Sequence, residues 1–186
     1  MTDGVATVLA PWSSFYVITG SSAAALTGLM FVVITLVRRS GASQSTTRDG
    51  VAAFSTPTVL HFCVALLVSA ILSAPWHSLV VPGALIAAAG LYGIIYILRV
   101  LLIAARFLDY IPDLEDWVWY TIAPFFAYVT VFAAAIALLH GMPAGALFVL
   151  AAGVVLLIFI GIRNAWDVST YIAVGNVQQG PPPPPE

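Results

Sequence analysis

The sequence predicts an all-α protein, a polytopic transmembrane bundle of about five spans. The first observation is composition: 61% of the 186 residues are hydrophobic and 8% are charged, whereas soluble domains carry about 25% charged residues. The second is that apolar runs of the length that crosses a bilayer, about 20 residues, recur along the chain. The third is that the basic residues fall near the ends of these runs on one side only.

An extracytoplasmic segment, residues 1–14, precedes the predicted transmembrane domain, residues 15–174. The first segment has no basic residue and the first apolar run is too long for a signal peptide, so we expect this run to remain as a span. The expected spans are 15–37, 52–74, 79–107, 117–139 and 144–162, with the last helix running on to about residue 174. The proline-rich tail, residues 175–186, is expected to be extended.

The arginines orient these spans. All six basic residues are arginines, and none lies in the three segments that the five-span arrangement places on the opposite side. Because basic residues concentrate in cytoplasmic loops, we expect the N-terminus outside and the C-terminus in the cytoplasm of a bacterial inner membrane. The absence of lysine excludes Schiff-base and P-loop chemistry, and the single cysteine, Cys63, excludes a disulfide within the chain.

Two local features concern the loops and the helix axes. The acidic stretch 109–116 contains Asp113, which is expected to cap the fourth span, with a cation-attracting vestibule as the alternative. Pro57 and Pro124 lie early in the second and fourth spans, where each removes a backbone donor and favours a kink.

Small residues repeat every four positions in the first span, at Gly20, Ala24 and Gly28. Small residues with this spacing let two helix backbones approach closely in a bilayer. We therefore expect this face to pack against another helix of the chain or against its own copy in a neighbouring protomer.

Polar residues within the spans form a candidate cluster near the inner leaflet, because ionisable groups in a membrane usually face the protein interior or water. Arg99 lies seven residues before Arg106, about 10 Å deeper in the membrane. It either snorkels or forms an ion pair, or belongs to an anion or proton site. His61 is either a hydrogen-bonded packing residue or a proton carrier. The cluster consists of His61, Tyr96, Arg99, Asn164 and Asp167.

Asp167 has several candidate partners. Arg163 precedes it by four residues on the same helix, and Arg99 or Arg106 could reach it from the third span. The structural interpretation is a clasp at the inner interface, and the functional alternative is the mouth of a conduction path.

Two stretches resemble a family of uncharacterised small bacterial inner-membrane proteins. One is the small-residue run of the first span, residues 20–33. The other is residues 162–167, which close the last span and contain the more distinctive Asn-Ala-Trp-Asp. Together they cover less than a fifth of the chain. The resemblance implies a multi-pass membrane protein and no established activity, so it adds no catalytic residue.

These observations are compatible with three functions. The first is a channel or carrier for ions or small solutes, formed as a homo-oligomer because five short spans leave little room for a pore in one protomer. The second is a non-transporting accessory, regulatory or scaffold subunit of a larger membrane complex. An intramembrane enzyme ranks last, because no catalytic spacing is present. No cofactor, metal or nucleic acid is expected; the expected partners are the lipid bilayer and other membrane subunits.

Overall fold

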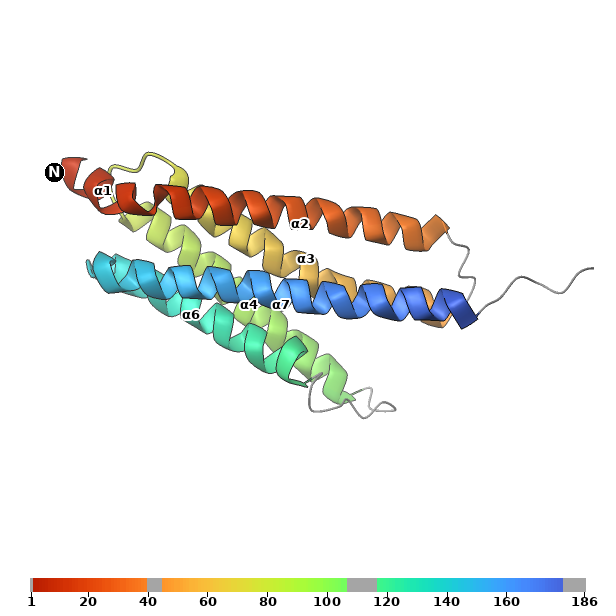
Figure 1. The fold of residues 1–186 in the computed structure, drawn as a ribbon. Helices are drawn as coiled ribbons and strands as arrows, with labels where there is room; N and C mark the ends of the chain where they lie inside the picture. Colours follow the sequence, from red (N-terminus) through yellow and green to blue (C-terminus); the bar gives the residue numbers. More distant parts are fainter. Residues whose placement is uncertain (1, 40–44, 107–116, 179–186) are drawn as a thin grey trace, which may run out of the picture.

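The computed structural model describes residues 2–39, 45–106 and 117–178, with side chains described for residues 4–35, 57–102 and 117–170. All regular structure in these ranges is helical (Figure 1). The elements are α1 (Thr2–Leu9), η1 (Ala10–Trp12), α2 (Ser13–Arg39), α3 (Ser45–Ser73), α4 (Val80–Arg106), η2 (Val118–Ile122), α6 (Ala123–Leu139) and α7 (Pro143–Gln178).

The prediction of an all-helical fold is confirmed, and the hydropathy of the helices indicates a membrane protein. Within the described residues, four stretches are long and apolar enough to cross a bilayer, namely 4–35, 80–102, 118–139 and 143–170. The long helix α3 adds a shorter apolar part, Pro57–Ser73. The capping role of Asp113 and the proline-rich tail lie outside the described residues.

A glycine and a proline separate α6 from α7. After α6, Gly141 has a φ of 74°, the left-handed conformation that glycine adopts without steric strain. The N–H of Met142 donates to the carbonyl of Ala137, and the N–H of Gly141 donates to that of Leu138. This pattern closes a helix C-terminus, and Pro143 then begins α7 at a position where proline is well tolerated.

The bundle consists of two helical hairpins joined by the last helix. In the first hairpin α2 packs along α3, and in the second α4 packs along α6, whereas α3 and α4 meet at far fewer positions. Helix α7 packs against both α3 and α6 and so contacts both hairpins (Figure 1). The core therefore lies where α3, α6 and α7 meet, with α4 behind α6 and α2 on the outside of α3.

Two glycines allow aromatic rings of neighbouring helices to pack closely. A Cβ on Gly93 of α4 would lie 2.1 Å from the ring of Tyr128 on α6, and a Cβ on Gly161 of α7 would lie 2.5 Å from the ring of Phe62 on α3. Such distances are far inside van der Waals contact. These two positions therefore let an aromatic ring lie directly on the backbone of a neighbouring helix.

The predicted small-residue face of the first span divides in the structure. Gly20 is buried, and a Cβ there would meet the Cβ of Ser69 on α3 at 3.0 Å. Ala24 and Gly28 are exposed, and Gly28 has nothing within 4 Å of its Cβ position. The reason is geometric: steps of four residues drift by about 40° each around a helix. Within the chain, Gly20 packs against another helix, while Ala24 and Gly28 face away from the bundle.

Pro124 explains a widened turn at the start of the fourth apolar helix. Because proline has no N–H, the carbonyl four residues earlier cannot be bonded in the α-helical way. The N–H of Ala123 donates instead to the carbonyl of Val118, and η2 is a π-helix over Val118–Ile122. Pro57 lies inside α3, which continues through it as one helix.

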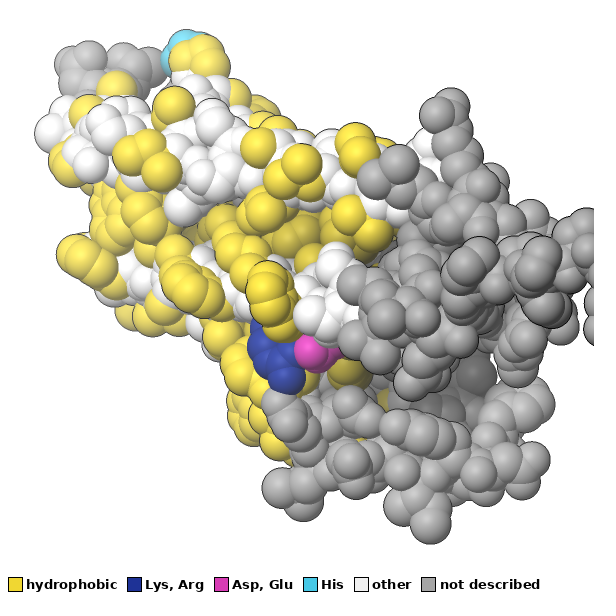
Figure 2. Space-filling view, turned by 45° about the vertical axis from the view of Figure 1, so that its right-hand side comes forward, with side chains coloured by type: hydrophobic (Ala, Val, Ile, Leu, Met, Phe, Trp, Pro, Cys, Tyr) yellow, Lys and Arg dark blue, Asp and Glu magenta, His cyan; other side chains and the backbone are white. Residues whose placement is uncertain are grey.

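The outer surface of the bundle is largely apolar (Figure 2). Large hydrophobic side chains on α2, α6 and α7 are more than half exposed, as for Phe31 (60%), Phe126 (60%) and Phe159 (62%). On the face that Figure 2 shows, the basic and acidic side chains in colour lie side by side. Arg163 and Asp167 form an ion pair. A surface with so much exposed apolar area is suited to lipid or to other membrane helices.

Candidate functional site

The candidate site is a buried polar group at the junction of three helices, which we name the inner polar centre: His61 of α3, Tyr128 of α6 and Asn164 of α7. All three side chains are fully buried. His61 Nδ1 and the Tyr128 hydroxyl are hydrogen-bonded at 2.8 Å, and the two rings lie 5.6 Å apart between centroids. This bond links the two hairpins directly across the core.

The glycine contacts position the first two members of the centre. The Tyr128 ring lies on Gly93 of α4, which leaves its hydroxyl directed away from α4 and toward α3. Phe62 lies on Gly161 of α7, and the preceding residue of α3, about 100° further around that helix, is His61. The imidazole is therefore directed at α6 while its neighbour packs on α7.

The rotation of α7 directs Asn164 toward the same point. Gly161 faces Phe62 of α3, and Gly153 faces Val131 of α6. At about 100° per residue, Gly153 lies about 80° around the helix from Gly161, and Asn164 lies about 60° around it in the same sense. Asn164 therefore points between α3 and α6, where His61 and Tyr128 meet.

Three polar atoms of the inner polar centre have no hydrogen-bond partner within the described part of the chain. They are Nε2 of His61 and both Oδ1 and Nδ2 of Asn164. Leaving a buried donor or acceptor unsatisfied costs about 1–3 kcal/mol, and the surrounding bilayer offers no alternative partner. The inner polar centre is therefore the least satisfied polar site in the described core.

The other predicted members of the cluster lie elsewhere. Arg99 is exposed on α4, on the same outward face as Tyr92, which is 58% exposed. No described side chain forms an ion pair with Arg99. Tyr96 is half-buried and packs against the core. The predicted cluster thus separates into a buried part with His61 and Asn164 and an outward-facing part with Arg99.

Asp167 is paired on its own helix. Its carboxylate accepts a hydrogen bond from the guanidinium of Arg163, four residues earlier. The Arg163 guanidinium also lies 6.0 Å from the ring centroid of Trp119, within the range of a cation–π contact. Of the partners that the sequence offers for Asp167, the structure shows Arg163, and this pair is linked to η2 through Trp119.

Sequence reasoning missed Tyr128, which is central to the site. The sequence does contain a signal for it: a tyrosine in the middle of an apolar span needs a hydrogen-bond partner for its hydroxyl once it is buried. His61 was the available partner at a comparable depth. What the sequence does not contain is the rotation of α6, which decides whether this tyrosine faces lipid or the core.

The core on the N-terminal side of α7 is apolar. Its fully or nearly fully buried side chains come from α3, α6 and α7 and include Val68, Leu72, Val131, Leu138, Leu147 and Leu150. Of the buried polar side chains in that half, Thr19 and Ser69 are hydrogen-bonded to each other at 3.1 Å between α2 and α3. The hydroxyl of Tyr16 on α2 has no partner among the described residues. Among the described residues, the inner polar centre therefore does not continue as a polar path through the protomer.

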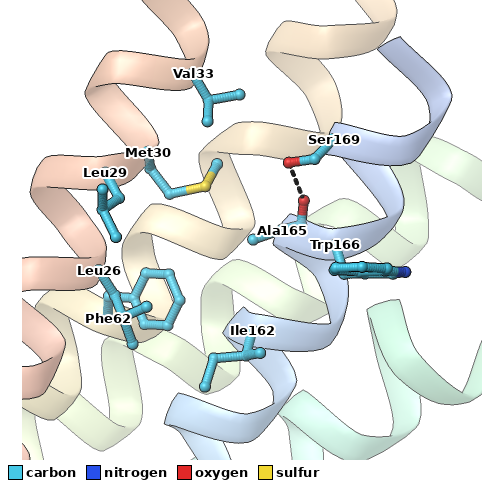
Figure 3. A pocket seen from close by; sticks show the side chains of 9 residues that line it. All are labelled: Leu26, Leu29, Met30, Val33, Phe62, Ile162, Ala165, Trp166 and Ser169. Carbon is cyan, nitrogen blue, oxygen red and sulfur yellow. Dashed lines mark hydrogen bonds between the residues drawn. The ribbon is translucent and has the colours of Figure 1, made fainter. Parts of the chain in front are cut away.

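A shallow groove of about 220 Å³ lies between α2 and α7 (Figure 3). Phe62 of α3 forms part of its wall, and Ser169, which could offer a polar group, donates its hydroxyl hydrogen bond to the carbonyl of Ala165. The remaining lining residues are apolar: Leu26, Leu29, Met30, Val33, Ile162 and Trp166. The groove is therefore lined mainly by apolar side chains, and its serine hydroxyl is already hydrogen-bonded.

Neither metal clusters nor known relatives add to this site. In the searched residues, no three His, Cys, Asp or Glu side chains come together as a metal site. No family model, curated protein or solved structure matches the chain.

Proposed function

We propose that the chain is a non-transporting accessory or scaffold subunit of a larger complex in a bacterial cytoplasmic membrane. In this proposal it crosses the membrane five times, with the N-terminus outside, and belongs to the uncharacterised multi-pass family that residues 20–33 and 162–167 resemble. The observation that carries the proposal is the exposed arginine, Arg99, on a helix that is apolar enough to span the bilayer.

An arginine facing lipid is unfavourable. Insertion scales assign about 2.5–3.5 kcal/mol to an arginine at the centre of a span, and the cost is smaller for Arg99, which lies seven residues before the end of α4. Arg99 shares its exposed face of α4 with Tyr92, Ile95 and Leu102, which are 58%, 42% and 61% exposed. A partner helix with an acidic or carbonyl group opposite Arg99 would satisfy the charge and cover these apolar side chains.

The separation of the predicted cluster disfavours a pore within one protomer. The buried residues His61 and Asn164 border an apolar half of the core, and Arg99 lies outside it. The second candidate is a channel formed by several copies, and the same α4 face supports it, because Tyr92 and Arg99 would then surround a central axis.

The test is photo-crosslinking from the α4 face in native membranes. A photoreactive residue at Ile95, one turn from Arg99, is expected to crosslink to a different protein, and Arg99→Gln is expected to abolish this product. The control position is Phe159 on α7, which is 62% exposed and so at least as accessible to lipid as Ile95, which is 42% exposed. Crosslinking of one copy to another, together with ion flux in liposomes, would favour the channel instead. Equal crosslinking to lipid at both positions would contradict both, since Arg99 would then simply snorkel.

The orientation is tested by cysteine labelling. In a Cys63→Ser background, Ser78→Cys and Gly141→Cys lie in the exposed connections after α3 and α6, and both are expected to react with a membrane-impermeant maleimide in intact cells. Gln178→Cys, at the last residue of α7, is expected to react only after the membrane is opened. The opposite pattern would reverse the orientation, and labelling of all three in intact cells would contradict the span count.

A further inference from the structure

We propose that the inner polar centre binds a water molecule between Nε2 of His61 and the side-chain amide of Asn164, inside the membrane-spanning part of the bundle. The inference does not depend on the proposed function, because it concerns the core and not the α4 surface. It rests on two fully buried side chains with free polar atoms and on the directions in which the helices present them.

The two side chains lie at nearly the same level. Helices α3 and α7 run antiparallel (Figure 1), and Phe62 touches Gly161. His61 is one residue before this contact on α3, and Asn164 is three residues after it on α7, so both are displaced in the same direction. At 1.5 Å per residue their backbones differ by only about 3 Å along the bundle axis. The similar level and the rotation of the two helices direct both side chains toward the same part of the core.

The atoms that remain free are complementary to a water molecule. If the Tyr128 hydroxyl donates to Nδ1 of His61, then Nε2 carries the proton and needs an acceptor. If Nδ1 donates to Tyr128, then Nε2 needs a donor. Water serves in either case, because it accepts from Nε2–H and donates to Oδ1 of Asn164, or accepts from Nδ2–H and donates to Nε2. A direct bond between the two side chains is not formed.

Energetics favour the occupied site. Buried waters typically make about three hydrogen bonds to polar groups that would otherwise be unsatisfied, and the centre offers three such atoms. The resulting chain, from Tyr128 through His61 and water to Asn164, joins α6, α3 and α7 at a single point. We infer that the water is a structural component of the core and that it keeps either tautomer of His61 satisfied.

The experiment is solid-state NMR of the full chain in lipid bilayers. His77→Gln and His140→Gln leave His61 as the single histidine for ¹⁵N labelling. We expect magnetisation transfer from water to Nε2 of His61, and loss of this signal in Asn164→Leu, which removes the amide. The matched control is Ser69→Ala, a buried polar residue bonded to Thr19, which is expected to keep the signal.

Each remaining outcome overturns the proposal. No transfer in the folded parent protein would show that the centre is dry. A direct through-space correlation between Nε2 of His61 and the Asn164 amide, at hydrogen-bonding distance, would show that the two side chains satisfy each other. Persistence of the signal in Asn164→Leu would place the water elsewhere. If Asn164→Leu does not fold, Asn164→Ser, which retains a polar group, is expected to preserve the transfer, and its loss there counts against the site.

Discussion

Tyr128 is held by contacts on two sides of its side chain. One face of the ring lies on the backbone of α4 at Gly93, and the hydroxyl reaches His61 on α3. Any side chain larger than hydrogen at position 93 would occupy the space of the ring. The glycine therefore determines where the Tyr128 ring lies. The ring position in turn places the Tyr128 hydroxyl within hydrogen-bonding distance of Nδ1 of His61.

Gly93→Ala is expected to destabilise the bundle, because its Cβ would lie 2.1 Å from the Tyr128 ring. Overpacking of this kind typically costs about 1–3 kcal/mol, so the thermal unfolding midpoint in mild detergent should fall. Gly145→Ala on α7, with nothing within 4 Å of its Cβ position, is the control. It is expected to be neutral or slightly stabilising, since alanine favours helix over glycine. Equal effects of the two substitutions would contradict the ring contact.

The sequence indicates which polar side chains have special roles more readily than it indicates whether each side chain faces the core or the outside of the bundle. That His61 and Asn164 would have special roles follows from their polarity within apolar runs. Their proximity to each other, the participation of Tyr128 and the outward position of Arg99 depend on how each helix is rotated about its axis. Several helices here are apolar on all sides, so no polar face sets that rotation, and packing at glycines decides it.

Helix boundaries followed from the sequence more closely. The predicted spans 79–107 and 117–139 compare with α4 at Val80–Arg106 and with η2 and α6 together at Val118–Leu139. Apolar runs and proline or glycine punctuation determine such ends. Helix α3 begins earlier than its predicted span, at Ser45, and α7 ends later than its predicted span, at Gln178. Hydropathy marks only the apolar part of a helix, whereas the helical backbone can continue into polar sequence.

Helix α2 is attached chiefly through α3. Its buried residues, such as Tyr16, Thr19 and Ala23, face that helix, and it meets α7 at few positions. The groove between α2 and α7 is the consequence (Figure 3). The position of α2 therefore depends mainly on its interface with α3, at which a Cβ on Gly20 would meet Ser69 at 3.0 Å.

Gly20→Leu is expected to separate α2 from α3, because even a Cβ at position 20 would meet Ser69 at 3.0 Å. The larger side chain should also break the hydrogen bond between Thr19 and Ser69. The measurement is spin-label distance between single sites on α2 and α3 in nanodiscs. Gly28→Leu, at an exposed position of the same helix, is the control and should leave the distance unchanged. An increase in both variants would indicate that Gly28 also has a partner, such as a second copy.

The whole molecule consists of two helical hairpins and a last helix, α7, that packs on both of them. The α2–α3 hairpin and the α4–α6 hairpin are each formed by neighbours in sequence, and α7 packs on both. Long-range order therefore resides mainly in the contacts of α7, together with the hydrogen bond between His61 and Tyr128.

This organisation predicts that the chain can be divided before α7. Residues 1–141 and residues 142–186, expressed together as separate chains, are expected to assemble and co-purify, because the break lies in an exposed turn. Residues 1–141 alone should be degraded or unfold at a lower temperature. A division within α3 at Ala65, which interrupts a buried helix, is the control and should not assemble. Normal stability of residues 1–141 alone would contradict the role of α7.

The late position of α7 has a consequence for biosynthesis. The ribosome delivers both hairpins to the membrane before the last helix exists, so until then the polar side chains of α3 and α6 lack the helix that completes their enclosure. A chain that stops early would present His61 and Tyr128 to lipid or to the quality-control proteases of the membrane. Arrival of Asn164 with α7 then encloses these two side chains, so the core is completed only once α7 has been made.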